Sequence, residues 1–276
     1  MFQGVTEFFG AGLVDKHGNV SQSGDGTIQN PKDVKKLKPF NIENCPQLEN
    51  EVAVIKALHK AEPDEPVFTI MDNPSMVASS LMDGENYYYH MIKNSAFVHE
   101  LTEFVFEPLV QCAKILLEAG TDILWLPMPT LGGTCISRGQ YEEFCLQYNK
   151  RFNQFVLEQD AMLMLHTCGN WNDRFDLAVS EGAHGLHVAE ADLAALKRDH
   201  GNEVCIMGQL PTVSVVVMSD AETVYKESLK ECLTAAPGGG FILSPDCGMP
   251  GSTRGENVEA MVRAARDAEK QLVGNC

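Results

Sequence analysis

One imidazole and two thiols have the types and the spacing that could hold a metal ion. His166-Thr167-Cys168 follows an apolar run at residues 162–165, and Cys247 comes shortly after another at residues 241–243. In an extended backbone residues i and i+2 point the same way, so His166 and Cys168 can face one ion. Two thiolates and one imidazole suit Zn²⁺. Three protein ligands leave a fourth position for a substrate, as in catalytic zinc sites.

The elements that must position these residues follow a regular alternation of short apolar runs and longer amphipathic stretches. We predict strands at residues 67–71, 122–127, 162–166, 185–188, 204–208 and 241–243, and helices from Pro74, at 92–119, from Ser137, and at 173–180, 193–198, 221–235 and 256–272. Alternating strands and helices indicate right-handed crossovers and a parallel sheet, and continuous apolar runs are typical of strands covered on both faces.

The predicted fold is an α/β fold of the (β/α)8 TIM type, which requires eight strands. Six strands are clear, and a seventh at residues 5–9 has a weaker pattern. Either the N-terminal third holds strands that its pattern does not reveal, or the barrel has a shortened or irregular N-terminal part. We expect one domain over residues 1–276, with an irregular, turn-rich segment at 1–60.

Composition excludes several classes of function. The net charge of −17 opposes binding to nucleic acid and to anionic membranes. Nine cysteines without regular spacing argue against a disulfide framework and favour a reducing compartment. The N-terminus lacks the pattern of a signal peptide, and no run of 18 apolar residues occurs. We therefore expect a cytoplasmic protein that binds neither nucleic acid nor membrane.

Other polar residues also follow predicted strands, where parallel α/β folds bind ligands. Asp72 and Asn73 are candidate cofactor-binding residues, although capping of the helix that begins near Pro74 is the favoured interpretation. His187 is a further candidate for cofactor binding or for orienting a metal ligand, with core packing as the alternative. Glu190 is a candidate fourth metal ligand, or an exposed carboxylate at the end of a strand.

Two segments give the chain a family resemblance. His166-Thr167-Cys168-Gly169, taken with residues 242–250 around Cys247, resembles the uroporphyrinogen decarboxylase superfamily, and more narrowly its methylcobamide:coenzyme M methyltransferase branch. The resemblance covers about residues 60–272. It implies a (β/α)8-type barrel that binds zinc through His166, Cys168 and Cys247, and a methylated corrinoid (methylcobalamin) that a partner protein carries.

The resemblance also implies a reaction, in which a thiol such as coenzyme M takes the methyl group from the corrinoid. The strand end at residues 126–129 lacks the acidic residue expected in these methyltransferases, so tetrahydrofolate or another thiol stays open as the acceptor. Two alternatives remain, a tetrapyrrole decarboxylase and a non-catalytic corrinoid-binding homologue. The decarboxylase is disfavoured because no arginine precedes Arg138, whereas decarboxylases of the superfamily hold substrate carboxylates with a basic N-terminal motif.

Overall fold

The computed structural model describes residues 28–35, 45–82 and 84–274, and these form two compact units. The first consists of Met1–Leu131 and Cys135–Met164, and the second of Gly132–Thr134 and Leu165–Cys276. Within the described residues no helix is long and apolar enough to cross a membrane. The expectation of a single domain stays a prediction, and each unit is described by itself below.

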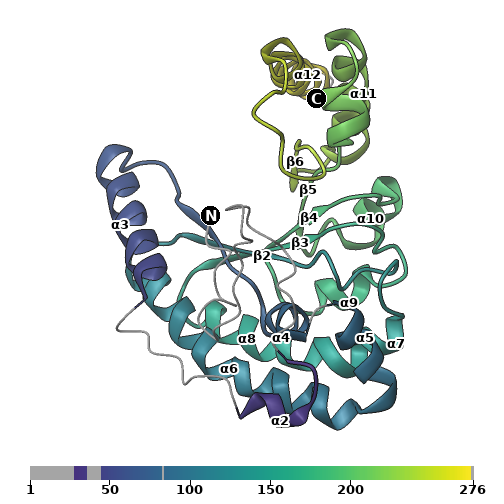
Figure 1. Ribbon diagram of the computed structural model, residues 1–276. Helices are drawn as coiled ribbons and strands as arrows, with labels where there is room; N and C mark the ends of the chain where they lie inside the picture. Colours follow the sequence, from purple (N-terminus) through teal and green to yellow (C-terminus); the bar gives the residue numbers. More distant parts are fainter. Residues whose placement is uncertain (1–27, 36–44, 83, 275–276) are drawn as a thin grey trace. The chain divides into compact units, whose positions relative to one another are not determined.

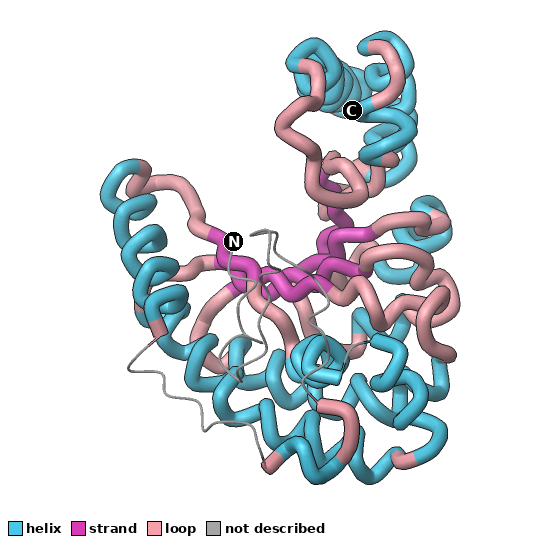
Figure 2. Tube along the Cα trace, in the orientation of Figure 1, coloured by secondary structure: helices cyan, strands magenta, loops and turns pink. Residues whose placement is uncertain are grey.

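Within the described part of the chain, six strands alternate with the helices and form one sheet in chain order (Figures 1 and 2). They are β1 (Phe68–Ile70), β2 (Ile123–Pro127), β3 (Met162–Thr167), β4 (Gly185–Val188), β5 (Cys205–Met207) and β6 (Phe241–Ile242). The pairs β1–β2, β4–β5 and β5–β6 are parallel. Parallel strands in sequence order with helical crossovers are the pattern of a TIM-type α/β fold, which confirms the predicted class. The predicted strand at residues 5–9 lies outside the described residues.

Helices of the first unit pack around the long helix α6 (Ser95–Glu118). The others are α2 (Pro31–Val34), α3 (Pro46–Ala61), α4 (Pro74–Met82), α5 (Gly84–Lys93), α7 (Arg138–Tyr141), the π-helix η2 (Glu142–Leu146) and α8 (Gln147–Leu157). One stripe of α6 is fully buried, with Leu101, Val105 and Leu109 on it, and this stripe lies against α4 and α8 (Figure 1). Residues spaced by three or four along a helix share a face, which gives α6 its packing surface.

The expectation of an irregular segment at residues 1–60 is wrong for α3. This helix begins with Pro46 in its first turn, where a proline costs no hydrogen bond, and the Cys45 sulfur accepts a hydrogen bond from the Leu48 N–H. Leu48 and Ile55 are buried on one face of the helix. Other apolar residues of the helix, such as Val54 and Leu58, are exposed, so its apolar positions do not mark one face and the helical period is concealed in the sequence.

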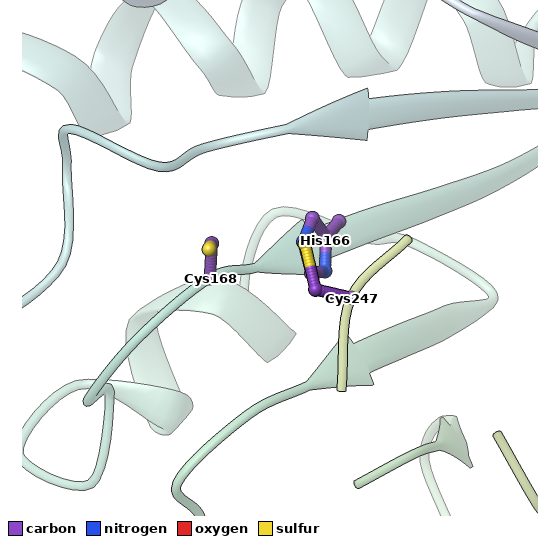
Figure 3. Close-up of side chains that lie close together, drawn as sticks. All are labelled: His166, Cys168 and Cys247. Atoms are coloured by element: carbon purple, nitrogen blue, oxygen red, sulfur yellow. The ribbon is translucent and has the colours of Figure 1, made fainter. Parts of the chain in front are cut away.

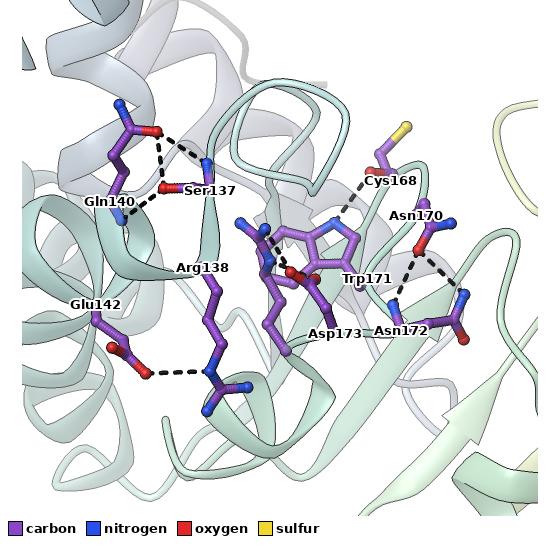
Figure 4. Close-up of polar contacts among 10 residues, drawn as sticks. Ser137, Arg138, Gln140, Glu142, Cys168, Asn170, Trp171, Asn172 and Asp173 are labelled. Atoms are coloured by element: carbon purple, nitrogen blue, oxygen red, sulfur yellow. Dashed lines mark hydrogen bonds and ion pairs between the residues drawn. The ribbon is translucent and has the colours of Figure 1, made fainter.

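The helix predicted at residues 92–119 ends as expected, but it begins differently. Gly120 stops it with a φ of +112°, a conformation that glycine adopts without steric cost. At the other end, Asn94 separates α5 from α6, so the predicted stretch contains the last two residues of one helix and all of the next. The helix predicted from Ser137 begins there with a capping box, and Figure 4 shows the reciprocal hydrogen bonds between Ser137 and Gln140.

In the second unit each strand from β3 onward precedes at least one helix. These are α9 (Phe175–Val179), α10 (Leu193–His200), the π-helix η3 (Thr212–Val217), α11 (Ala221–Ala235) and α12 (Gly255–Val273). Helices α11 and α12 lie side by side (Figure 1). A buried cluster of Leu210, Val216, Val224, Ala260 and Met261 joins them to η3 and to the end of β5. The loops after β3 and β6 carry the predicted metal ligands.

Candidate metal centre

The three predicted metal ligands come together in the second unit. His166 is the penultimate residue of β3, Cys168 follows that strand, and Cys247 lies in the turn after β6. One ligand atom from each lies within 4.8 Å of the others (Figure 3). In tetrahedral zinc sites, bond lengths of about 2.0 Å to nitrogen and 2.3 Å to sulfur set ligand atoms roughly 3.5–3.8 Å apart. The three side chains therefore need only small movements to close around an ion.

His166 has its ring oriented by a main-chain group. Its Nδ1 lies 3.3 Å from the carbonyl oxygen of His187, which also accepts a hydrogen bond of 3.1 Å from the Thr167 hydroxyl. An Nδ1–H that donates to this carbonyl leaves the Nε2 lone pair for a metal. Burial, followed by the nearby His187, lowers the pKa of His166 to about 4. The ring is therefore neutral at pH 7, as a metal ligand must be.

His187 links the histidine ligand to the turn that carries Cys247. Its ring stacks on that of His166 with centroids 4.4 Å apart and planes 24° apart, and its Nε2 lies 2.7 Å from the carbonyl oxygen of Pro245. Burial lowers the pKa of His187 as well, so its ring packs in the neutral form. These contacts agree with the packing and orienting interpretations of His187. Its role in cofactor binding stays a prediction.

Cys168 lies at the start of a tight turn that a tryptophan holds in place. The indole Nε1–H of Trp171 donates a hydrogen bond of 3.0 Å to the Cys168 carbonyl oxygen, and Gly169 takes the left-handed conformation with a φ of +78° (Figure 4). Burial, followed by the neighbouring Cys247, raises the pKa of the Cys168 thiol to about 11. Without a cation the site therefore holds a thiol at position 168, and a bound metal would be needed to stabilise the thiolate.

Cys247 is exposed, and the turn that carries it is fixed by hydrogen bonds to the segment after β5. The Asp246 Oδ1 accepts hydrogen bonds from the N–H and the hydroxyl of Thr212, at 3.0 and 2.6 Å. The Thr212 hydroxyl oxygen also lies 3.2 Å from the Cys247 N–H, which donates to it. Asp246 and Thr212 thus join this turn to the start of η3, and the Cys247 sulfur lies within 4.8 Å of the ligand atoms of His166 and Cys168.

Glu190 does not belong to the group of ligand atoms within 4.8 Å of one another. It follows β4, its side chain is exposed, and its charge is among those that raise the pKa of Cys168. A second carboxyl group, that of Glu231 on α11, accepts a hydrogen bond of 3.0 Å from the backbone N–H of Gln209. Burial raises the pKa of Glu231 to about 7. The fourth-ligand role of Glu190 stays a proposal.

Asp72 and Asn73 belong to the first unit, at the end of β1. The Asn73 Oδ1 accepts a hydrogen bond of 2.9 Å from the N–H of Met76, so Asn73 caps the start of α4 as the favoured interpretation predicted. Its Nδ2 is buried without a hydrogen-bond partner among the described residues. Burial raises the pKa of Asp72 from 3.8 to about 7. Their predicted role in binding a cofactor is not tested by these contacts.

The pKa of Asp72 predicts how stability should depend on pH. Burial raises the pKa of the Asp72 carboxyl group in the folded state, so as the pH rises above 4 the unfolded chain loses the Asp72 proton first. The fold is therefore destabilised progressively until about pH 7. Asp72→Asn removes the titration, so this variant should be more stable than the parent at pH 8, by up to about 4 kcal/mol, and nearly equal to it at pH 4. Urea unfolding of both proteins at pH 4, 6 and 8 measures the difference. The exposed Asp64→Asn is the matched control, and an Asp72→Asn difference that stays constant with pH would contradict the prediction.

Sequence reasoning predicted the three side chains that the structure brings together, but it missed the residues that hold the surrounding loops. Trp171 binds the Cys168 carbonyl within the loop after β3, whereas Thr212 and Gln209 bind residues of other loops, at Cys247 and Ala191. The signal available for Trp171 was its place three residues after Cys168, in a turn that contains Gly169. For Thr212 no local pattern indicates a contact with residue 247.

Comparison with known proteins places the chain among characterised relatives. A family model described as uroporphyrinogen decarboxylase (URO-D) matches residues 4–268. The chain is 26% identical to two proteins named methylcobamide:CoM methyltransferase MtbA, from Methanosarcina acetivorans over 265 residues and from Methanosarcina mazei over 267 residues. Each alignment covers 95% of this chain and 76% of the relative.

A solved structure shares the fold. It is described as a methyltransferase from Methanosarcina mazei, with a TM-score of 0.79 and 20% sequence identity, and the alignment covers 97% of this chain and 78% of that one. At this identity the likeness concerns the fold, which agrees with the TIM-type architecture. The match of the family model extends over nearly the whole sequence, from residue 4 to residue 268. The chain belongs to the uroporphyrinogen decarboxylase (URO-D) family.

Proposed function

We propose that this chain is a zinc-dependent methyltransferase that moves a methyl group from a methylated corrinoid, carried on a partner protein, to a thiol of the coenzyme M type. Both MtbA relatives are named for methyl transfer between a cobamide and coenzyme M, which makes the chain a methyltransferase. The convergence of His166, Cys168 and Cys247 carries the finer proposal, because these donors form a set that zinc prefers.

The residues present fit a zinc ion. His166 would bind through Nε2, since its Nδ1 faces the His187 carbonyl, and Cys168 and Cys247 would bind as thiolates. Three protein ligands leave a position for the acceptor, and we propose that Glu190 occupies it before the acceptor arrives. When bound, zinc would lower the pKa of a coordinated thiol and so supply a thiolate nucleophile at neutral pH.

The residues of the chain position the acceptor in the proposed reaction. The buried, neutral His166 and the two cysteines fix the place where the acceptor sulfur binds, and this proximity lowers the barrier. During transfer the sulfur electron pair forms a bond to the methyl carbon, the cobalt–carbon bond breaks with its electrons kept by cobalt, and the thiol proton leaves to solvent. Such a displacement needs no general acid, and the buried His166 and His187, with their lowered pKa values, are poor proton donors at pH 7.

Three other assignments stay open to the same experiment. A tetrahydrofolate acceptor would replace the thiol, a tetrapyrrole decarboxylase would need no metal, and a non-catalytic homologue would bind corrinoid without transfer. No specific observation favours any of them over the thiol methyltransferase. The decarboxylase is disfavoured because no arginine precedes Arg138 to hold substrate carboxylates.

Metal analysis and an absorbance assay test the proposal together. The purified protein should contain about one zinc per chain, and with methylcobalamin and 2-mercaptoethanesulfonate it should consume the methylcobalamin spectrum while a methyl thioether appears by mass spectrometry. Chelation should abolish the reaction and added Zn²⁺ should restore it. Methyl transfer to tetrahydrofolate and not to the thiol would identify tetrahydrofolate as the acceptor. Full activity in metal-free protein, or zinc bound without any methyl transfer, would contradict the proposal.

A further inference from the structure

Two side-chain amides bind the turn that follows β4, at residues 190–192. The Asn172 Nδ2–H donates to the Glu190 carbonyl oxygen at 2.8 Å, and the Asp192 N–H donates to the Asn172 Oδ1 at the same distance. Asn172 is itself anchored, because its N–H and its Nδ2–H both lie 3.1 Å from the Oδ1 of Asn170 (Figure 4). One amide therefore ties the loop after β3 to both ends of this turn.

Gln209 binds the middle of the same turn from the end of β5. The Ala191 N–H donates to the Gln209 Oε1 at 2.5 Å, and the Gln209 Nε2–H donates to the Ala191 carbonyl oxygen at 2.7 Å. The backbone N–H of Gln209 is held in turn by Glu231. Four successive polar groups of the turn backbone, from the Glu190 carbonyl to the Asp192 N–H, are thus bound by two side chains.

The backbone that these amides hold is strained. Glu190 has a φ of +49°, in the left-handed region that residues other than glycine and asparagine rarely adopt. Such a conformation persists only where the surroundings enforce it. Core packing cannot supply the force at residue 190, because its side chain is exposed. The hydrogen bonds of Asn172 and Gln209 can, since they fix the backbone on the C-terminal side of residue 190.

The strained residue lies next to the segments that carry two of the candidate metal ligands. Glu190 follows β4, the strand that supplies the His187 carbonyl to His166, and its own carbonyl is bound by Asn172, which belongs to the same loop as Cys168. We infer that Asn172 and Gln209 are positioning residues, which hold Glu190 in the left-handed conformation so that its carboxylate reaches the metal as an exchangeable fourth ligand. This inference rests on the proposed function, since it requires a metal at His166, Cys168 and Cys247.

Cobalt substitution separates this role from mere stabilisation of the turn. In Co²⁺-loaded protein, Asn172→Ala, Gln209→Ala and Glu190→Gln should all shift the ligand-field bands to one common spectrum. The sulfur-to-cobalt charge-transfer bands should keep their intensity, because both thiolates remain. Asn172→Asp and Gln209→Glu retain the side-chain oxygen that accepts a hydrogen bond but lose the NH₂ group that donates one. Their ligand-field spectra should lie between those of the parent and of the alanine variants. Asn202→Ala, an exposed asparagine outside this turn, should leave the spectrum unchanged.

A double-mutant cycle gives an independent measurement. Mutation of a residue that hydrogen-bonds to a metal ligand typically changes metal affinity by about 10–100-fold. We therefore expect Asn172→Ala and Glu190→Gln each to speed zinc release to a chromogenic chelator by about 10-fold. If both act through the same carboxylate, adding Asn172→Ala to Glu190→Gln should cause no further change. If the effects of Asn172→Ala and Glu190→Gln on the rate of zinc release multiply in the double variant, the positioning role is wrong. A cobalt spectrum of Asn172→Ala identical to that of the parent would also overturn this role, but not the metal site. Failure of the parent protein to bind Co²⁺ would overturn the metal site, and this inference with it.

Discussion

Cys247→Ser should lower zinc affinity and methyl transfer by at least about 100-fold, because it removes a ligand and not only an outer partner. The hydroxyl of serine is a poor zinc ligand, and the two remaining protein ligands cannot complete a catalytic site. The variant should still fold, since Cys247 is exposed and the surrounding hydrogen bonds of Thr212 and Asp246 do not use its sulfur. Elemental analysis and the methylcobalamin assay measure the two effects.

Cys135→Ser is the matched control for this prediction. Cys135 is also exposed, and it lies in the first unit, outside the group that could hold a metal. Its loss should leave zinc content and transfer unchanged. If Cys247→Ser instead kept a full equivalent of zinc and parental activity, the assignment of the third ligand would be wrong.

Trp171→Ala should have the largest effect on stability of any single change in the ligand-bearing loops. Trp171 heads the fully buried side chains by size, and its truncation removes both packing and the hydrogen bond to the Cys168 carbonyl. Replacing a buried tryptophan with alanine costs about 3–5 kcal/mol. Trp171→Phe keeps most of the volume but leaves the carbonyl without its donor, and should cost about 1–3 kcal/mol.

Urea unfolding followed by circular dichroism measures these free energies. Trp125, the other tryptophan of the chain, provides the control because it is half-buried and lies in the first unit. Trp125→Phe should therefore cost less than Trp171→Phe, and it should not change the rate of zinc release. Equal costs for the two phenylalanine variants would show that the hydrogen bond to Cys168 contributes nothing.

The sequence predicted the α/β class, and it predicted the six strands that the structure describes to within a residue or two of their ends. It succeeded because continuous apolar runs and their turns are local signals. It failed for α3, whose exposed face carries apolar residues such as Val54 and Leu58 that blur the helical period, and it assigned no element to residues 212–217. That run of β-branched residues forms the π-helix η3, where Pro211 precedes Thr212 and Asp246 binds the Thr212 N–H. Long-range hydrogen bonds of this kind leave no pattern in the local sequence.

The proximity of His166, Cys168 and Cys247 was predictable for a related reason. His166 and Cys168 are two residues apart, which fixes their common direction, and the carboxyl ends of parallel strands bring Cys247 to the same edge. Most of the contacts that hold these loops were not predictable. Thr212 and Gln209 bind residues 247 and 191, which are distant in the sequence, so no spacing indicates these contacts. Only Trp171 lies close in the sequence to its partner, three residues after Cys168.

The hydrogen bond that orients His166 has a consequence for how such a site can diverge. Its acceptor is the carbonyl oxygen of residue 187, a peptide group that every amino acid carries. A change of the side chain at position 187 would remove the stacked ring but would leave that oxygen in place, provided β4 keeps its course. Orientation of the ligand is thus inherited with the path of the backbone, so it can survive in distant homologues after nearly all of the neighbouring side chains have been exchanged.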